Sequence, residues 1–318
     1  MRILITTKSA LRHQILLALL CRHFHGQIVG ICIQSQKKEK SIKKPRRGSV
    51  IRKLSLAYLN RLKTLTGFSG ATISRNRIEL GYQRQLHSLY NYRPTDEWKI
   101  YGIEEHYDID PNSKLSQSWV TKKKPDLIVV FGGKILKGTW LNTAKYGVLN
   151  MHYGILPAYR GGHSTEFALY QGNLDQIGAS VHYVDRGIDT GTLISKHYVS
   201  PVGVTSLNTL LAKVYKAGLD GLINEVKQIT EAKGQRAIQI KEPVQAGIPK
   251  SHHYGAKHFH KEIRLRAQQR LALINSVEWP HYSRLYDLCS KDYFSEFNGD
   301  KGASSKLKKS YCQFWCLA

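Results

Sequence analysis

The stretch GVLNMHYGILPAYRGGHSTEFALYQGNLDQIGASVHYVDRGIDTGTLISK, which runs from Gly147 to Lys196, decides the fold. Its segment 148–151 and the apolar run Leu127–Phe131 before it are rich in residues that favour β-strands. Polar side chains follow directly after each run, at the strand ends where α/β sheets hold their sites. The stretch therefore predicts an α/β protein with a reaction site at the ends of its strands.

Asn150 and His152 are separated by one residue, so in an extended strand both side chains point to the same face of the sheet. An amide and an imidazole placed together can donate hydrogen bonds to a carbonyl oxygen that gains negative charge during attack. The imidazole can also move a proton near neutral pH. This pair therefore suits a substrate carbonyl group that is attacked by a nucleophile.

The segment DRGIDTG lies between two predicted strands, 179–184 and 192–198, and brings the carboxylates of Asp185 and Asp189 to the same end of the sheet. A purely structural interpretation competes with this one, because such side chains often bond only to the backbone of their own turn. Each polar residue taken singly is more often structural than catalytic. Their joint occurrence at this spacing favours a reaction site.

The runs NMHYGILPAYRG (150–161), GASVHYVD (178–185) and DTGTLI (189–194) together resemble the folate-dependent formyltransferases. By motif position, the resemblance implies that Asn150, His152 and Asp189 are catalytic. It also implies acyl transfer, in which an amine attacks the formyl carbon of 10-formyltetrahydrofolate and Asn150 and His152 meet the oxyanion. Gly154 departs from the family pattern, which often has Ser at this position.

The same resemblance implies how the co-substrate, 10-formyltetrahydrofolate, is held. The expected folate contacts come from the turn after Leu127–Phe131 and from the segment that leads into Asp189: Gly132, Gly133, Lys134, Ile135, Leu136, Val184, Asp185 and Ile188. The acceptor amine is expected at Tyr159, Arg160 and Gly161. We expect no metal, because the chain shows no tetrahedral spacing of cysteine and histidine ligands.

Alternating β-rich and helical segments predict a Rossmann-like, mostly parallel sheet with helices on both faces. We expect a catalytic domain over residues 1–235, interrupted by a basic loop and helical insertion over 35–95, and a short divergent C-terminal extension over 236–318. Further expected elements are strands at 2–6, 28–33 and 98–103 and helices at 112–121, 206–225 and 259–273. Within the insertion, residues 51–92 are expected to form helices over the sheet edge.

Basic residues dominate the charge, with 48 Lys and Arg against 23 Asp and Glu and a formal net charge of +25. Nine basic side chains and one acidic side chain lie between Lys37 and Lys53. Such a block is usually a solvated loop, and it can attract the phosphates of an RNA acceptor stem, a nucleotide sugar or an anionic membrane surface.

The acceptor amine stays open at this point. The preferred interpretation is a nucleotide-linked amino sugar, because the C-terminal part lacks the pattern of the β-barrel that methionyl-tRNA formyltransferases carry there. Methionyl-tRNA is the alternative, and it is favoured by the basic loop. A 10-formyltetrahydrofolate hydrolase and a non-catalytic RNA-binding protein on the same core are two further alternatives.

The apolar segments near the start of the chain predict a first strand and its following helix, and no transmembrane span. The five cysteines include no C-x-x-C pair, so reduced thiols are expected. Together these features predict a cytoplasmic protein. The 42% content of apolar residues is enough to build a core and excludes a disordered chain.

Overall fold

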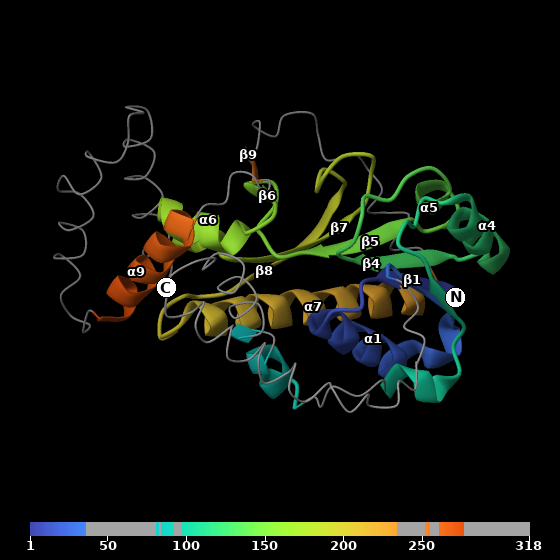
Figure 1. Ribbon diagram of the computed structural model, residues 1–318, viewed down its shortest axis with the longest axis horizontal. Coiled ribbons are helices and arrows are strands. Elements are labelled where there is room, and N and C mark those ends of the chain that lie inside the picture. Colours follow the sequence, from blue (N-terminus) through green and yellow to red (C-terminus); the bar gives the residue numbers. More distant parts are fainter. Residues whose placement is uncertain (36–80, 83, 92–96, 234–251, 255–260, 277–318) are drawn as a thin grey trace, which may run out of the picture.

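The computed structural model describes residues 1–35, 81–82, 84–91, 97–233, 252–254 and 261–276 (Figure 1). Two predictions lie outside these residues. They are the conformation of the basic loop at 37–53 and the helices expected in the first part of the insertion.

A seven-stranded sheet forms the centre of the molecule (Figure 1). In spatial order its strands are β3 (Glu105–Tyr107), β2 (Ile28–Ile33), β1 (Ile3–Thr7), β4 (Leu127–Phe131), β5 (Val148–His152), β7 (Gly178–Tyr183) and β8 (Leu193–Tyr198). The pairs from β3 to β5 are parallel, whereas β7 runs antiparallel to both β5 and β8. This sheet confirms the predicted Rossmann-like, mostly parallel architecture.

Helices cover both faces of the sheet, so its central strands are buried on both sides (Figure 1). One face packs against α1 (Leu11–Phe24) and α7 (Leu207–Glu231), and the other against α4 (Lys114–Lys123) and the short α5 (Thr139–Asn142). Side chains of β4 alternate between two cores, with Val129 in the α1 and α7 core and Ile128 beside Trp140 in the other. Burial on both faces explains why the strand is a continuous apolar run.

The helix predicted at 206–225 is α7, which begins after Ser206 and continues to Glu231. The Ser206 hydroxyl caps the helix by accepting a hydrogen bond of 3.1 Å from the Thr209 N–H. The predicted end was too early, because Val226 and Ile229 continue the buried stripe. All inner residues named from the sequence are buried: Leu207, Leu210, Leu211, Val214 and Leu219.

Two further helices confirm predictions made from the sequence, although their first and last residues differ from the predicted ones. The helix predicted at 112–121 is α4, and its N-cap Ser113 accepts a hydrogen bond of 3.1 Å from Ser116 N–H. The helix predicted at 259–273 is α9 (Lys261–Ser276), which buries Ile263, Ala267 and Leu271 as expected. Short 3₁₀ helices connect other elements: η1 (His25–Gln27), η2 (Glu97–Tyr101) and η3 (Leu174–Gln176).

The prediction of a strand at 98–103 is wrong, because η2 occupies most of this segment and strand β3 begins only at Glu105. Trp98 is buried and its indole N–H donates to Glu105 at 2.7 Å, whereas Ile100 is 75% exposed. The alternation of apolar residues over 98–103 therefore does not reflect the two faces of a strand. Tyr101 stacks on His25 and fastens the turn to the end of α1.

The described part of the insertion does not lie over the sheet edge, so that prediction is corrected. Residues 84–89 are helical and lie against α7, on the side away from the sheet (Figure 1). Tyr82 stacks on Tyr215 with ring centroids 5.2 Å apart, and the Tyr90 hydroxyl donates to Asp220 at 2.7 Å. These contacts place the segment over the outer surface of α7.

A second, two-stranded sheet lies beside the main one and joins β6 (Tyr159–Gly161) to β9 (His252–Tyr254). Next to it, α6 (Ser164–Gln171) packs against α9 (Figure 1). The described part of the C-terminal extension is therefore docked against the segment that follows β5.

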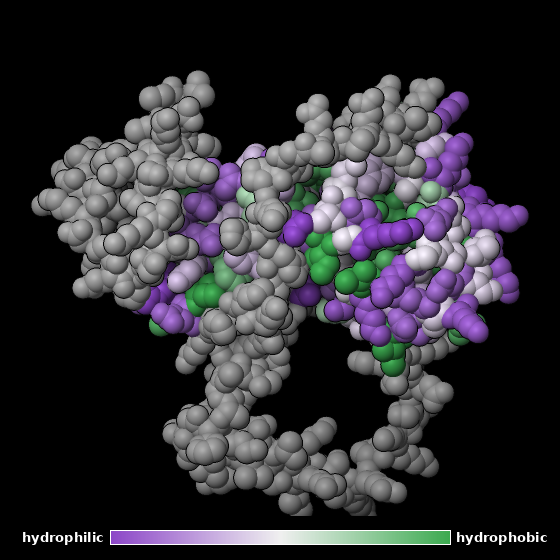
Figure 2. All heavy atoms as spheres, turned by 90° about the horizontal axis from the view of Figure 1, so that it is seen from above, coloured by the Kyte–Doolittle hydropathy of each residue, from purple (hydrophilic) through white to green (hydrophobic). Residues whose placement is uncertain are grey.

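No helix among the described residues is long and apolar enough to cross a membrane. Cys21 and Cys32 are buried free thiols. The cytoplasmic location stays a prediction. Seen from above, the described surface combines hydrophilic side chains with an apolar area (Figure 2). Exposed apolar side chains include Ile135 and Ile188, which belong to segments expected to contact a ligand.

Gly218 allows α7 to approach the sheet closely, because a Cβ there would lie 2.7 Å from both the Ala179 Cβ and the Met151 Sδ. We expect Gly218→Val to lower the free energy of unfolding by about 1–3 kcal/mol through overpacking, although valine favours a helix more than glycine does. Urea denaturation measures the change. Asn224→Val, on the exposed side of the same helix, is the control and should change stability by less than about 0.5 kcal/mol. Equal stabilities for the two variants would contradict close packing at Gly218.

Candidate active site

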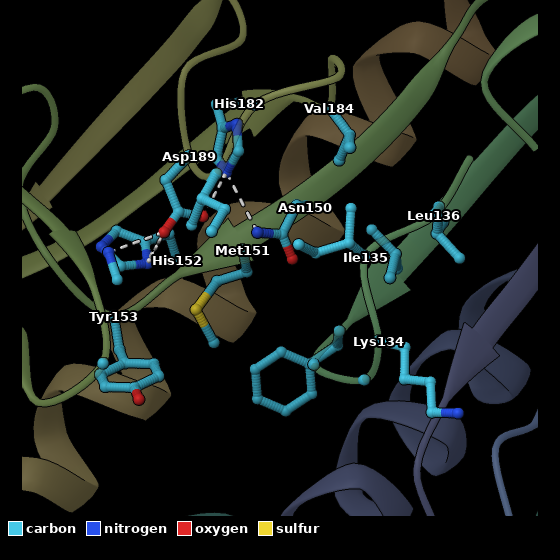
Figure 3. A pocket seen from close by; sticks show the side chains of 18 of the residues that line it. Lys134, Ile135, Leu136, Asn150, Met151, His152, Tyr153, His182, Val184 and Asp189 are labelled. Atoms are coloured by element: carbon cyan, nitrogen blue, oxygen red, sulfur yellow. Dashed lines mark hydrogen bonds and ion pairs between the residues drawn. The ribbon is translucent and has the colours of Figure 1, made fainter. Parts of the chain in front are cut away.

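A cavity of about 310 Å³ opens at the carboxyl ends of β4 and β5. Segments far apart in the sequence line it, including the start of α1, the turn after β4, the end of β5 and the loop after β7. Figure 3 shows Asn150, His152, His182 and Asp189 together on one side and the residues after β4 opposite them. The wall includes every residue expected to contact folate: Gly132, Gly133, Lys134, Ile135, Leu136, Val184, Asp185 and Ile188.

Asn150 faces His182 across the antiparallel pair formed by β5 and β7. The Asn150 Nδ2 lies 3.0 Å from the His182 Nε2, and the His182 Nδ1 lies 2.8 Å from the Tyr183 carbonyl oxygen. Because the carbonyl can only accept, the His182 proton belongs on Nδ1 and Nε2 accepts from the amide. His182 therefore fixes the orientation of Asn150, whose second N–H stays uncommitted among the described residues.

The two carboxylates in the loop after β7 have different roles. Asp185 accepts hydrogen bonds from the Gly187 N–H at 2.9 Å and the Thr190 hydroxyl at 2.6 Å, so its side chain shapes the turn. Asp189 has a positive φ of 51° and turns its carboxylate towards the histidines (Figure 3). Gly191 closes the loop tightly, because a Cβ there would overlap the Tyr183 carbonyl oxygen.

Asp189 holds three segments together. One carboxylate oxygen lies 3.4 Å from the His152 Nδ1 and accepts a hydrogen bond of 2.8 Å from the Gly161 N–H, and the other lies 3.6 Å from the His182 Nε2. Burial would raise the pKa of the Asp189 carboxyl, but the two imidazoles and the Gly161 N–H lower it well below its usual range. The carboxylate therefore stays ionised at neutral pH.

His152 is 4% exposed, and both of its ring nitrogens face oxygen atoms. The Nε2 lies 2.8 Å from the Tyr159 carbonyl oxygen, while Nδ1 faces Asp189. Burial lowers the pKa of His152 below its ordinary value, although the Asp189 carboxylate acts in the opposite direction. A neutral ring has one N–H for these two acceptors, whereas a protonated ring donates to both. His152 can thus act as a base, because the acceptors for both N–H groups of its protonated ring are already in place.

Ser164 takes the space next to Gly154, the position at which this sequence departs from the pattern expected from the resemblance. A Cβ at Gly154 would lie 2.6 Å from both the His152 Nε2 and the Ser164 Cβ. The buried Ser164 hydroxyl itself lies 3.4 Å from the His152 Nε2. A hydroxyl next to the imidazole is therefore still present, but it comes from the start of α6.

The residues expected at the acceptor amine are not all at the cavity. Gly161 lines it, and its neighbour Gly162 does so too. Tyr159 does not line the cavity; its side chain is buried and donates through its hydroxyl to Gln171 at 2.7 Å. Arg160 is likewise outside the wall of the cavity. Alternation along β6 places Arg160 on the face opposite to that of Tyr159 and Gly161.

Several wall residues had no role in the sequence-based prediction: Arg12, His13, Tyr153, His182 and Tyr215. The Arg12 guanidinium donates to the Tyr82 hydroxyl at 2.6 Å and lies 6.0 Å from the centre of the Tyr215 ring. A signal existed for Arg12 and His13, because they follow the first strand at its carboxyl end. No sequence signal pointed to Tyr215, which comes from the middle of α7.

Apolar side chains flank the polar group of the site. Ile135 is 47% exposed on one side of the cavity, and Ile188 is 41% exposed in the loop that carries Asp189. Such a slot suits a flat, partly apolar ring, and the amide and imidazoles suit a reacting carbonyl. The arrangement can bind a carbonyl group, stabilise an oxyanion and move a proton.

Comparisons with known proteins agree with this chemistry. The model of the family described as formyl transferase matches residues 1–226. Methionyl-tRNA formyltransferase of Thermosynechococcus vestitus is 32% identical over 108 residues, which are 34% of this chain and 32% of that protein. Methionyl-tRNA formyltransferase of Chlamydia caviae is 40% identical over 105 residues, or 33% of this chain and 32% of that one. The matched part therefore spans about a third of the length of these relatives.

Among solved structures, the N-formyltransferase from Helicobacter canadensis in complex with folinic acid and dTDP-3-aminofucose covers 86% of this chain and 80% of that chain. The sequences are 13% identical and the TM-score is 0.49.

The pKa of His152 should depend on one of the two loop carboxylates. We expect Asp189→Asn to lower the pKa of His152 further, because the variant removes the charge that opposes the effect of burial. Nuclear magnetic resonance of labelled histidine rings measures the titration. Asp185→Asn is the matched control and should leave the pKa of His152 unchanged, since the described hydrogen bonds of that side chain, from the Gly187 N–H and the Thr190 hydroxyl, lie within its own turn. A His152 pKa that stays constant or rises in Asp189→Asn would contradict this electrostatic picture.

Proposed function

This chain belongs to the formyl transferase family, and we propose that it transfers a formyl group from 10-formyltetrahydrofolate to a primary amine. The observation that carries the proposal is the convergence of Asn150, His152 and Asp189 in one cavity with the residues expected to hold folate.

In the proposed reaction, the lone pair of the neutral amine attacks the formyl carbon. A carbon–nitrogen bond forms to the acceptor while the formyl oxygen takes the negative charge. The uncommitted N–H of Asn150 donates to this oxyanion, and His182 holds the amide in place. Collapse of the tetrahedral intermediate breaks the bond between the formyl carbon and the folate nitrogen. No covalent intermediate with the protein is needed.

His152 moves the proton in this proposal. The attacking nitrogen loses a proton and the departing folate nitrogen gains one, so one base that becomes an acid serves both events. Burial keeps His152 neutral before the reaction, which leaves it able to accept the proton. Asp189 and the Tyr159 carbonyl then accept hydrogen bonds from the protonated ring. Asp189 thus makes proton uptake by a buried imidazole less costly.

The folate side of the cavity consists of the turn after β4 and the loop after β7. We propose that the ring system lies between Ile135 and Ile188, with Leu136 and Val184 as further apolar contacts. The backbone of Gly132 and Gly133 and the side chains of Lys134 and Asp185 supply polar groups around it. Their placement on one wall supports the folate contacts expected from the sequence.

For the acceptor, the curated relatives favour methionyl-tRNA over the nucleotide-linked amino sugar that the sequence patterns suggested. The net charge of +25 supports a polyanionic acceptor, and we propose that the basic loop at 37–53 contacts its phosphates. One observation still favours the amino sugar. The described part of residues 236–318 contains β9 and α9, whereas the resemblance to methionyl-tRNA formyltransferases implies a β-barrel there.

The acceptor is identified by following release of tetrahydrofolate from 10-formyltetrahydrofolate with the full chain. Reactions contain charged initiator tRNA, nucleotide-linked amino sugars or no acceptor. We expect turnover with tRNA, with a rate that falls steeply with salt if the basic loop contacts phosphates. Turnover only with an amino sugar would identify the amino sugar, and not tRNA, as the acceptor. Equal turnover without any acceptor would make the protein a hydrolase, and RNA binding without turnover would leave the non-catalytic alternative.

The oxyanion role of Asn150 predicts a loss of rate and little loss of binding. We expect Asn150→Ala to lower kcat by about 100- to 1000-fold, as for other oxyanion donors, with a small change in KM for the folate. Steady-state kinetics with the acceptor identified above measure both constants. Asn224→Ala, at an exposed position of α7 outside the cavity wall, is the control and should have the kcat and KM of the unchanged protein. A kcat of Asn150→Ala equal to that of the unchanged protein would remove the oxyanion role.

A further inference from the structure

Strand β6 carries two backbone groups that hold the catalytic side chains. The Tyr159 carbonyl oxygen lies 2.8 Å from the His152 Nε2, and the Gly161 N–H donates to Asp189 at 2.8 Å. The orientation of His152 and the position of Asp189 therefore both depend on where this three-residue strand lies.

Strand β6 is not part of the main sheet, and its partner in the described structure is β9 from the C-terminal extension. The register places Gly161 opposite Tyr254, and the next residue, Gly162, donates its N–H to the Tyr254 carbonyl at 2.8 Å. A strand as short as β6 gains little stability from its own residues, so its position depends on this pairing and on side-chain contacts.

The Tyr254 side chain packs between β6 and α6 and so holds the pair of strands in place. Its ring stacks on Tyr159 and on Phe167 of α6, with centroid distances of 5.5 Å and 4.2 Å. Gln171, also on α6, donates to the Tyr254 hydroxyl at 2.9 Å and accepts from the Tyr159 hydroxyl at 2.7 Å. Tyr254 therefore joins β6 to α6.

Helix α9, which follows β9 in the C-terminal extension, also packs against α6 (Figure 1). The Arg264 guanidinium lies 2.8 Å from the carboxylate of Glu166, whose side chain is only 3% exposed. Burial would raise the pKa of Glu166, but His163 and Arg264 lower it below its ordinary value. Arg270 donates to the carbonyl oxygens of Leu169 and Tyr170 at the end of α6. A buried ion pair and a helix cap thus hold α9 in one place.

We propose that β9 and α9 are a positioning element of the active site, in which Tyr254 sets the place of β6 and so the orientation of His152 and Asp189. The inference rests on the proposed function for its catalytic consequence. It also moves the functional boundary, because the unit that performs the reaction includes residues 252–276 in addition to residues 1–235.

The test uses Tyr254→Ala and Tyr254→Leu in the full chain, with thermal unfolding to select conditions in which each variant is folded. We expect kcat for formyl transfer to fall about 10- to 100-fold, because small displacements of catalytic groups have effects of this size. The KM for 10-formyltetrahydrofolate should change less than about twofold, since none of the folate-side wall comes from β6 or β9.

Two further variants separate positioning from general damage. Tyr254→Phe retains the ring contacts with Tyr159 and Phe167, and it should restore most of the kcat. Gln268→Ala, at an exposed position of α9, should have the kcat of the unchanged protein. A KM that rises while kcat is constant, or equal losses in Tyr254→Ala and Gln268→Ala, would overturn the proposal.

A measurement without substrate tests the geometry even if the proposed function fails. The Nε2–H of His152 is bonded to the Tyr159 carbonyl, so its exchange with water should be slow in the unchanged protein and in Tyr254→Phe. Exchange should be at least about tenfold faster in folded Tyr254→Ala, because β6 is released. The same exchange rate in all three proteins would overturn the positioning role. Absence of folate turnover in the unchanged protein would remove only the proposed function.

Discussion

The buried carboxylate of Asp189 is the interaction on which the site depends. It lies between His152 on β5 and His182 on β7, and it accepts the Gly161 N–H from β6. A carboxylate loses much of its hydration on burial, so it stays charged only where donors and cationic groups replace the water. This requirement fixes the distances between three segments that are far apart in the sequence. The carboxylate of Asp189 can reach this position because Asp189 has a positive φ and the turn closes tightly at Gly191.

The two sides of the cavity have different physical tasks. The wall formed after β4 and β7 is partly apolar and exposed, as suits binding of a flat ring from solution. The end of β5 is buried, and hydrogen bonds hold each polar group in one orientation. Binding tolerates some movement of side chains, whereas the stabilisation of an oxyanion requires donors that are already in position. The exposed, partly apolar groups and the buried, hydrogen-bonded polar groups thus follow different strands.

Aromatic packing connects the cavity to the outer surface of α7. Tyr153 at the end of β5 stacks on Tyr215 of α7, and Tyr215 stacks in turn on Tyr82 of the insertion. Arg12 lies against the same ring and donates to Tyr82. Because these contacts are continuous, the described part of the insertion supports the part of the cavity wall that Arg12 and Tyr215 form. The C-terminal strand and helix support the opposite side through β6.

The sequence by itself determined most strands of the main sheet, its main helices and the three candidate catalytic residues Asn150, His152 and Asp189. Continuous apolar runs such as Leu127–Phe131 indicate burial on both faces, and the spacing of Asn150 and His152 places them on one face. Local patterns failed at 98–103, where Trp98 is held by a contact with Glu105 that is not visible in the alternation of residues. Only the tertiary structure decided that Asp189 faces the histidines while Asp185 shapes its turn, and that the ring of Tyr159 packs against Tyr254. The physical reason is that side-chain direction in loops and short strands is set by partners distant in sequence, which no local periodicity encodes.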